Sequence, residues 1–277
     1  MAKFDKFTGG NKALTDGSGA RGIADQRGGR ASTMIDQIRD EYRDVASAER
    51  RILGKPAKIA FALDATGSMA NLIEAAKGSL AEIIRRVSAE SPRPLEIEIF
   101  VYRDYDVPNL VMQRSGLATD AAKLVAWLKQ VRPDGGGGNA GEAVEAAIDA
   151  IVRAGDFSTV ILAGDEPSNP RADLNAVGRH NTPTAHDLAT GLGRSGVPIH
   201  SFVVGADPRT IADFRKLSDA SGGKSGRLDG TREMIDLAVM AILAAIEGTS
   251  SVARYASNNL LSSNAKAYAQ LLIGGSK

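Results

Sequence analysis

The chain has 277 residues, of which 43% are hydrophobic and 24% are charged, a composition typical of globular proteins. Its formal net charge is +1, so we expect neither nucleic acid nor a membrane as a partner. The absence of cysteine excludes disulfide bonds, zinc–thiolate sites and cysteine nucleophiles. The first residues lack the apolar core of a signal peptide, and the longest apolar run, Leu237–Ile246, is too short to span a bilayer. We therefore expect a cytoplasmic protein.

The composition divides the chain into four segments. Residues 1–31 are rich in glycine and charged residues and have few apolar anchors, so they predict a flexible arm. Residues 32–55 carry a broken apolar stripe at helical spacing, which predicts an N-terminal helix. Residues 56–247 contain the predicted domain, and residues 248–277 are expected to form a C-terminal helical tail.

Between residues 56 and 247, predicted strands and helices alternate. The strands are continuous or alternating apolar runs, expected at 59–63, 95–102, 109–113, 158–163, 197–204 and 222–228. The helices have apolar residues three and four positions apart, and are expected at 69–87, 120–131, 139–154, 184–194, 208–218 and 231–246. This alternation predicts an α/β fold with a doubly wound, mostly parallel sheet and helices on both faces. Ligands of such folds bind outside the carboxyl ends of the strands.

The first candidate site directly follows the strand at 59–63. Asp64, Thr66 and Ser68 occupy alternate positions in the turn between this strand and the next helix. Carboxylate and hydroxyl oxygens are the ligands that a hard divalent cation such as Mg²⁺ takes. The same residue types also form ordinary helix caps, so this turn alone leaves both interpretations open.

The sequence Asp64-x-Thr66-x-Ser68 resembles the metal-ion-dependent adhesion site of von Willebrand factor type A domains. Thr66 stands where most of that family has serine, and it keeps the hydroxyl group. The sequence DATGSM is most similar to the corresponding segment of the members associated with alpha-kinases. The resemblance extends over about residues 58–247 and implies the same fold that the strand and helix pattern predicts.

Two further loops carry the resemblance. The second loop of the alpha-kinase-like members reads roughly Gly-Gly-Gly-Asp-x-x-Glu, and Gly136–Gly138, Asn139 and Glu142 are similar to it. Asn139 departs from that pattern, because it replaces an aspartate and removes one negative charge. Asp165, which follows Gly164, matches the aspartate that ends the fourth strand of the family.

The resemblance implies a Mg²⁺ site, with Mn²⁺ or Ca²⁺ as alternatives. The implied ligands are Asp64, Thr66, Ser68, Asn139 and Asp165. Three neighbours are expected to lie behind these ligands or to face a partner: Asp104, Glu142 and Gly138.

The implied function is binding of a protein partner. Two aspartates roughly neutralise a divalent ion, and the neutral ligands leave it able to accept an Asp or Glu carboxylate from the partner, as in the resembled family. Intracellular members often serve as adaptors beside ATPases or kinases. We therefore expect a Mg²⁺-dependent adaptor or scaffold subunit of a bacterial or phage multi-protein system, with no enzyme activity of its own. The sequence leaves the oligomeric state open.

Two other interpretations stay open at this point. A strand that ends in Asp-x-Thr-Gly-Ser is also similar to haloacid-dehalogenase-like phosphatases, which use Mg²⁺ and an aspartate nucleophile. Those enzymes carry a second aspartate two residues later as general acid, where this chain has Thr66. Alternatively, the protein is a structural assembly subunit with a degenerate metal site, an interpretation that Asn139 supports.

Overall fold

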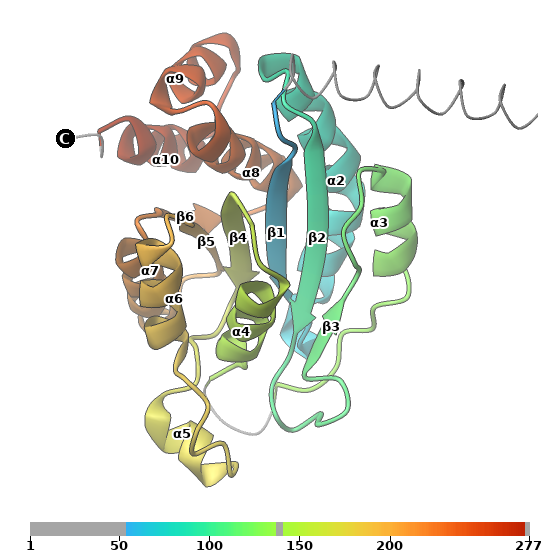
Figure 1. Cartoon of the computed structure of the whole chain (residues 1–277), viewed down its shortest axis with the longest axis vertical. Coiled ribbons are helices and arrows are strands. Elements are labelled where there is room, and N and C mark those ends of the chain that lie inside the picture. Colours follow the sequence, from blue (N-terminus) through green and yellow to red (C-terminus); the bar gives the residue numbers. More distant parts are fainter. Residues whose placement is uncertain (1–53, 137–140, 275–277) are drawn as a thin grey trace, which may run out of the picture. The chain divides into compact units, whose positions relative to one another are not determined.

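The computed structural model describes residues 54–136 and 141–274. The predicted arm, nearly all of the predicted N-terminal helix, Gly138 and Asn139 lie outside the described residues. Within them, one sheet has the strand order β3-β2-β1-β4-β5-β6 (Figure 1). Its strands are β1 (Ala57–Asp64), β2 (Leu95–Tyr102), β3 (Met112–Arg114), β4 (Thr159–Gly164), β5 (Ile199–Val204) and β6 (Ser225–Leu228). All neighbours pair in parallel except β2 and β3, which confirms the mostly parallel sheet.

The described helices cover both faces of the sheet, as predicted. They are η1 (Gly67–Met69), α2 (Ala70–Glu90), α3 (Ala121–Leu128), α4 (Val144–Ala154), α5 (Arg171–Ala176), α6 (Ala185–Arg194), α7 (Pro208–Ser221), α8 (Thr231–Ile246), α9 (Thr249–Asn258) and α10 (Ser263–Gly274). None of them is both long and apolar enough to cross a membrane, a finding restricted to the described residues.

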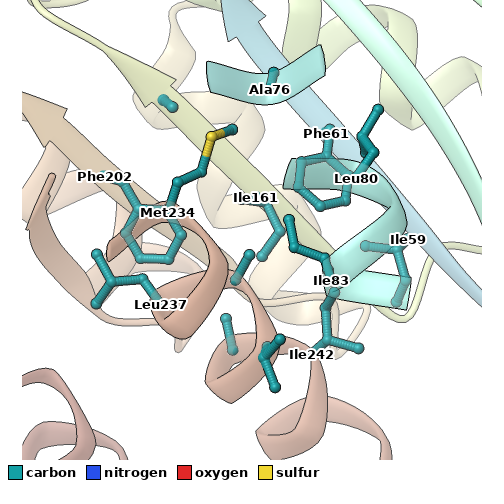
Figure 2. Close-up of a cluster of buried hydrophobic side chains, with 14 of the residues drawn as sticks. Ile59, Phe61, Ala76, Leu80, Ile83, Ile161, Phe202, Met234, Leu237 and Ile242 are labelled. Carbon is teal, nitrogen blue, oxygen red and sulfur yellow. The ribbon is translucent and has the colours of Figure 1, made fainter. Parts of the chain in front are cut away.

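Strand β1 lies in the middle of the sheet and divides the core into two layers. Because side chains alternate along a strand, Ile59 and Phe61 face one layer and Ala60 and Ala62 face the other. The first layer packs against α2, α3, α8, α9 and α10, and Figure 2 shows part of it, where Phe61 lies among side chains of α2, α8 and the neighbouring strands. The second layer packs against α4, α6 and α7.

The segment after residue 247 forms two helices that pack on the same core. Helix α8 is buried almost all round, from Asp236 to Leu243, and a helix buried on every side needs cover on its outer side. Helices α9 and α10 provide that cover and contribute the buried Val252, Tyr255 and Tyr268 to the first layer. The predicted boundary at 247 therefore coincides with the end of α8 but not with an edge of the core.

Local details differ from the sequence-based expectations at several elements, and β3 (Met112–Arg114) and β6 (Ser225–Leu228) are shorter than expected. Asp120 caps α3, because its side chain accepts a hydrogen bond from the backbone N–H of Ala122 at 2.8 Å, so this helix begins one residue later than predicted. Helix α4 begins at Val144 rather than at 139. The short α5 is absent from the prediction, since its six residues span fewer than two turns.

Candidate metal centre

The first predicted loop lies at the carboxyl end of β1, with its three oxygen-bearing side chains together. The backbone N–H and the hydroxyl of Thr66 both donate to Oδ1 of Asp64, each at 2.8 Å. The hydroxyls of Thr66 and Ser68 lie 3.2 Å apart. Asp64 and Thr66 are buried, whereas Ser68 is exposed, so this group of oxygens opens to solvent on the side of Ser68.

Asp165 joins this group from the neighbouring strand. The register pairs Leu63 of β1 with Ala163 of β4, so the residues that follow the two strands emerge side by side. The carboxyl groups of Asp64 and Asp165 are close enough for the charge of Asp165 to raise the pKa of Asp64. The structure therefore brings together four of the five predicted ligands, and the fifth, Asn139, lies outside the described residues.

Gly164, directly before Asp165, has no room for a side chain. A Cβ atom on Gly164 would lie 2.5 Å from the Tyr102 hydroxyl and 3.3 Å from Oδ2 of Asp64. Tyr102 is buried and donates from that hydroxyl to the carbonyl of Ala163 at 3.3 Å. The phenol thus occupies the space that a larger residue at 164 would need.

Two carboxylate oxygens at this centre are buried and lack a partner. Among the described residues, neither Oδ2 of Asp64 nor Oδ1 of Asp165 has a hydrogen-bond partner. Burial raises the pKa of Asp64 to about 7, the two bonds from Thr66 oppose that rise, and the neighbouring Asp165 adds to it. A buried polar atom without a partner is costly, and a bound divalent cation would satisfy both oxygens at once. The donor set therefore fits Mg²⁺.

The second loop reaches the first through Gly135 and Gly136. The N–H of Gly67 donates to the carbonyl of Gly135 at 3.1 Å. Gly136 has a φ of +91°, and a Cβ atom there would lie 2.9 Å from the Cβ of Thr66 and 3.0 Å from Oε1 of Glu142. Only glycine combines this backbone conformation with so close an approach. The part of the glycine run that the structure describes therefore has a defined position beside Thr66.

Glu142 and Asp104, the predicted neighbours, form an acidic group behind the ligands. Both are buried, and Asp104 accepts a hydrogen bond from the side chain of Asn169 at 3.1 Å. Oε2 of Glu142 has no hydrogen-bond partner among the described residues. Burial, followed by repulsion from Asp64, Asp104 and Asp165, raises the pKa of Glu142 to about 9. Gly138, the third predicted neighbour, lies outside the described residues.

The comparison with known families identifies the domain. A family model described as von Willebrand factor A domain matches residues 58–228, more than half of the chain. The chain belongs to the von Willebrand factor A domain family. This confirms the resemblance inferred from the sequence, and the matched region includes the loops of Asp64 and Asp165.

Solved structures of several other proteins also match this von Willebrand factor A domain. BatB, a conserved hypothetical protein from Bacteroides thetaiotaomicron, is 14% identical, with 73% of this chain and 99% of that chain covered and a TM-score of 0.47. An aerotolerance-related membrane protein from Bacteroides fragilis is 13% identical, covering 67% and 98%, with a TM-score of 0.46. The SpRpn10 VWA domain is 12% identical, covering 65% and 94%, with a TM-score of 0.48. No curated protein matches the chain.

A buried arginine that the sequence analysis does not single out holds the loops of this von Willebrand factor A domain. Arg103 directly follows β2, and its guanidinium donates to the carbonyl of Leu110 at 2.9 Å, to Oε1 of Gln113 at 3.0 Å and to the carbonyl of Arg132 at 2.6 Å. It is also close enough to Asp64 to interact with its charge. No local sequence signal marks Arg103 for this role, because its partners Leu110, Gln113 and Arg132 are brought to it by the fold.

Few side chains supply negative charge to the candidate metal centre. Among the residues that the structure describes, no three His, Asp or Glu side chains form a group arranged to hold a metal ion. A cation in this domain would therefore depend on two carboxylates, Asp64 and Asp165, together with the neutral hydroxyls of Thr66 and Ser68. Such a centre carries only enough negative charge to neutralise one divalent ion.

Proposed function

We propose that this domain is a Mg²⁺-dependent protein-interaction module. The observation that carries the proposal is the pair of buried oxygens, Oδ2 of Asp64 and Oδ1 of Asp165, which have no partner among the described residues. Asp64, Thr66, Ser68 and Asp165 would hold the ion, and the predicted ligand Asn139 would add a neutral oxygen. Mn²⁺ has similar ligand preferences, whereas Ca²⁺ takes six to eight oxygens and fits this small set less well.

The bound ion would supply an open coordination position for an Asp or Glu carboxylate of a protein partner. Its two positive charges are balanced by Asp64 and Asp165, because the hydroxyl ligands add none. Ser68 is exposed, so the partner would approach from that side. A direct bond between the metal and the carboxylate would form the energetic centre of the interface, surrounded by weaker contacts.

We further propose that the chain acts as a cytoplasmic adaptor or scaffold subunit, beside a partner such as an ATPase or kinase component of a bacterial or phage system. The chain would contribute binding rather than catalysis. Thr66 stands where the phosphatases considered above carry a general-acid aspartate, and a threonine hydroxyl does not serve as such an acid near neutral pH.

Thermal unfolding with titrated MgCl₂, after removal of metal with EDTA, tests the proposal. A ligand that binds only the folded state stabilises it by about 2.7 kcal/mol at a hundredfold excess over Kd. We expect this gain in the intact chain and its loss in Asp165→Asn. The matched control is Asp156→Asn, which removes the same charge from an exposed residue whose φ of +56° asparagine tolerates well. Equal stabilisation of the intact chain and Asp165→Asn would contradict the proposed site.

A further inference from the structure

The free edge of β6 forms a groove at one end of the sheet, whereas the candidate metal centre lies at the carboxyl ends of β1 and β4, further inside the strand order. In the described sheet, β6 is the last strand and pairs only with β5. Figure 1 shows it between α7 and α10, at the end of the sheet opposite β3. The groove has a volume of about 410 Å³, with Ser225, Gly226 and Arg227 lining it from the strand. An edge strand offers backbone groups to which another strand can bind.

The register specifies which backbone groups point into the groove. Ser201 of β5 is the register partner of Ser225, and its N–H donates to the carbonyl of Lys224 at 3.2 Å. In a parallel pair, successive residues direct their N–H and C=O groups alternately to the two sides of the strand. Lys224 and Gly226 therefore bond toward β5, whereas Ser225 and Arg227 direct their backbone groups away from it.

Helices on opposite faces of the sheet form the walls of the groove. Ile211, Arg215 and Asp219 lie four residues apart along α7, so they share one face of that helix. Leu271 lines the groove from α10 on the other side. Ile211 and Leu271 are 41% and 47% exposed, which leaves apolar surface on both walls. A strand added to β6 would direct alternate side chains toward these two walls.

The charge of the groove favours an acidic occupant. Arg215, Lys224 and Arg227 line it together with a single carboxylate, Asp219. Arg227 pairs with Asp229 at 3.0 Å, but neither Arg215 nor Lys224 forms an ion pair within residues 54–136 and 141–274. A second copy of the chain, pairing edge to edge, would bring the same cations against each other. The excess of positive charge therefore disfavours self-association and favours a partner of opposite charge.

We propose that the edge of β6 binds an extended segment of a protein partner, in which apolar and acidic residues alternate, as an additional strand. Its backbone would pair with Ser225 and Arg227. Because its side chains alternate between the two walls, its apolar side chains would cover Leu271 on the α10 wall and its carboxylates would approach Arg215 on the α7 wall. This site needs no metal, so it goes beyond the function proposed above and does not depend on it.

The test uses the full chain and a fluorescein-labelled peptide of alternating valine and glutamate, with binding followed by fluorescence anisotropy. Ser225→Pro removes an N–H that points into the groove and leaves the bonds to β5 in place, a position at which an edge strand tolerates proline. Loss of one interfacial hydrogen bond corresponds to an affinity about tenfold lower. We expect that loss in Ser225→Pro and Arg215→Glu, but not in Ser225→Ala. EDTA should have no effect.

Two control peptides test strand pairing and charge with the intact chain, in case Ser225→Pro does not fold. The first has lysine in place of glutamate, and the second has N-methyl groups on alternate backbone nitrogens, which blocks strand pairing without changing the side chains. Both should bind about tenfold more weakly or worse than the parent peptide. No binding of the valine–glutamate peptide, or equal binding of the N-methylated one, would overturn the proposal. A dimer of the chain that Ser225→Pro dissociates would assign the edge to a second copy instead.

Discussion

Two buried aspartates of this domain differ in how their charge is compensated. Asp236 on α8 is 2% exposed and accepts hydrogen bonds from Arg86 at 2.9 Å and from the Tyr255 hydroxyl at 2.9 Å. Asp64 at the end of β1 is fully buried, and its Oδ2 has no partner among the described residues. The chain thus supplies a cation for one aspartate. For the other it supplies a second carboxylate, Asp165, while Arg103, which interacts with the charge of Asp64, directs its hydrogen bonds to other residues. We propose that a bound cation completes the compensation.

This difference separates a structural site from the proposed binding site. The Arg86–Asp236–Tyr255 group joins α2, α8 and α9 and is complete in the folded chain. The Asp64–Asp165 pair is unfavourable in isolation, because burial and mutual repulsion both disfavour two charged carboxylates. A protein that keeps such a pair loses stability when no ligand is bound, and this cost is typical of sites selected for binding rather than for folding.

The largest expected effect is a gain of stability in Asp64→Asn without metal. Raising the pKa of a carboxyl group from 3.8 to about 7 costs the folded state about 4 kcal/mol at pH 8. Asparagine removes this cost, retains an Oδ1 acceptor for Thr66 and can donate to Asp165. Urea unfolding in EDTA at pH 8 should therefore show a more stable variant. The gain should vanish toward pH 4, where the aspartate is protonated in the folded state and increasingly so in the unfolded state.

The second prediction concerns His200, which the chain keeps neutral beneath α10. Its Nδ1 accepts hydrogen bonds from the Tyr268 hydroxyl at 2.7 Å and from the backbone N–H of Lys224 at 3.2 Å. Burial lowers its pKa to about 4 from an ordinary 6.5. Between these values the unfolded chain binds a proton that the folded chain does not, so stability falls as pH drops through this window, by about 3 kcal/mol in all.

Measuring the free energy of unfolding from pH 7 to pH 4 for the intact chain and His200→Gln tests this prediction. The variant should lose less stability over that range, because glutamine does not titrate. Both proteins should be measured in the Asp64→Asn background, since Asp64 changes stability in the opposite direction over the same range. Parallel pH profiles of the two proteins would contradict the assignment of a buried neutral histidine.

The smallest effect is expected from removing the charge of Asp236, the aspartate that pairs with Arg86. Asp236→Asn should destabilise the chain by about 2 kcal/mol, below the usual cost of breaking a fully buried pair, because Arg86 is partly exposed and also pairs with Glu82 at 2.6 Å. Urea unfolding with and without Mg²⁺ measures it. The loss should be the same in both conditions. A loss that depended on Mg²⁺ would show that the two aspartates are coupled, contrary to the distinction drawn here.

The sequence predicts most of the sheet because its strands are locally distinctive. In the run at 95–102 apolar residues alternate with Glu96 and Glu98, Pro94 bounds the run, and the observed β2 has the same limits. Thr184 begins a helix through a capping box with Asp187, as the residue pattern favours. The packing of helices α9 and α10 on the core is not predictable from local sequence, because it depends on contacts of Tyr255 and Tyr268 with residues far away in sequence.

The candidate site was predictable only in part. Asp64, Thr66 and Ser68 are close in sequence, and Asp165 follows from the rule that parallel strands end at one edge of the sheet. The role of Arg103 depends on oxygens of Leu110, of Gln113 on β3 and of Arg132, and no local pattern encodes these contacts. The clash that requires Gly164 likewise depends on Tyr102 of a different strand, two positions away in the sheet.

The central claim is that Asp64 and Asp165 hold a divalent cation, and electron paramagnetic resonance with Mn²⁺ tests it most directly. The signal of free Mn²⁺ should fall on addition of the EDTA-treated chain, with one ion bound per chain, and should recover when excess Mg²⁺ displaces the Mn²⁺. Asp64→Asn should leave the signal of free Mn²⁺ unchanged, whereas Asp156→Asn should behave like the intact chain. Equal Mn²⁺ binding by the intact chain and Asp64→Asn, or no binding by either, would contradict the account.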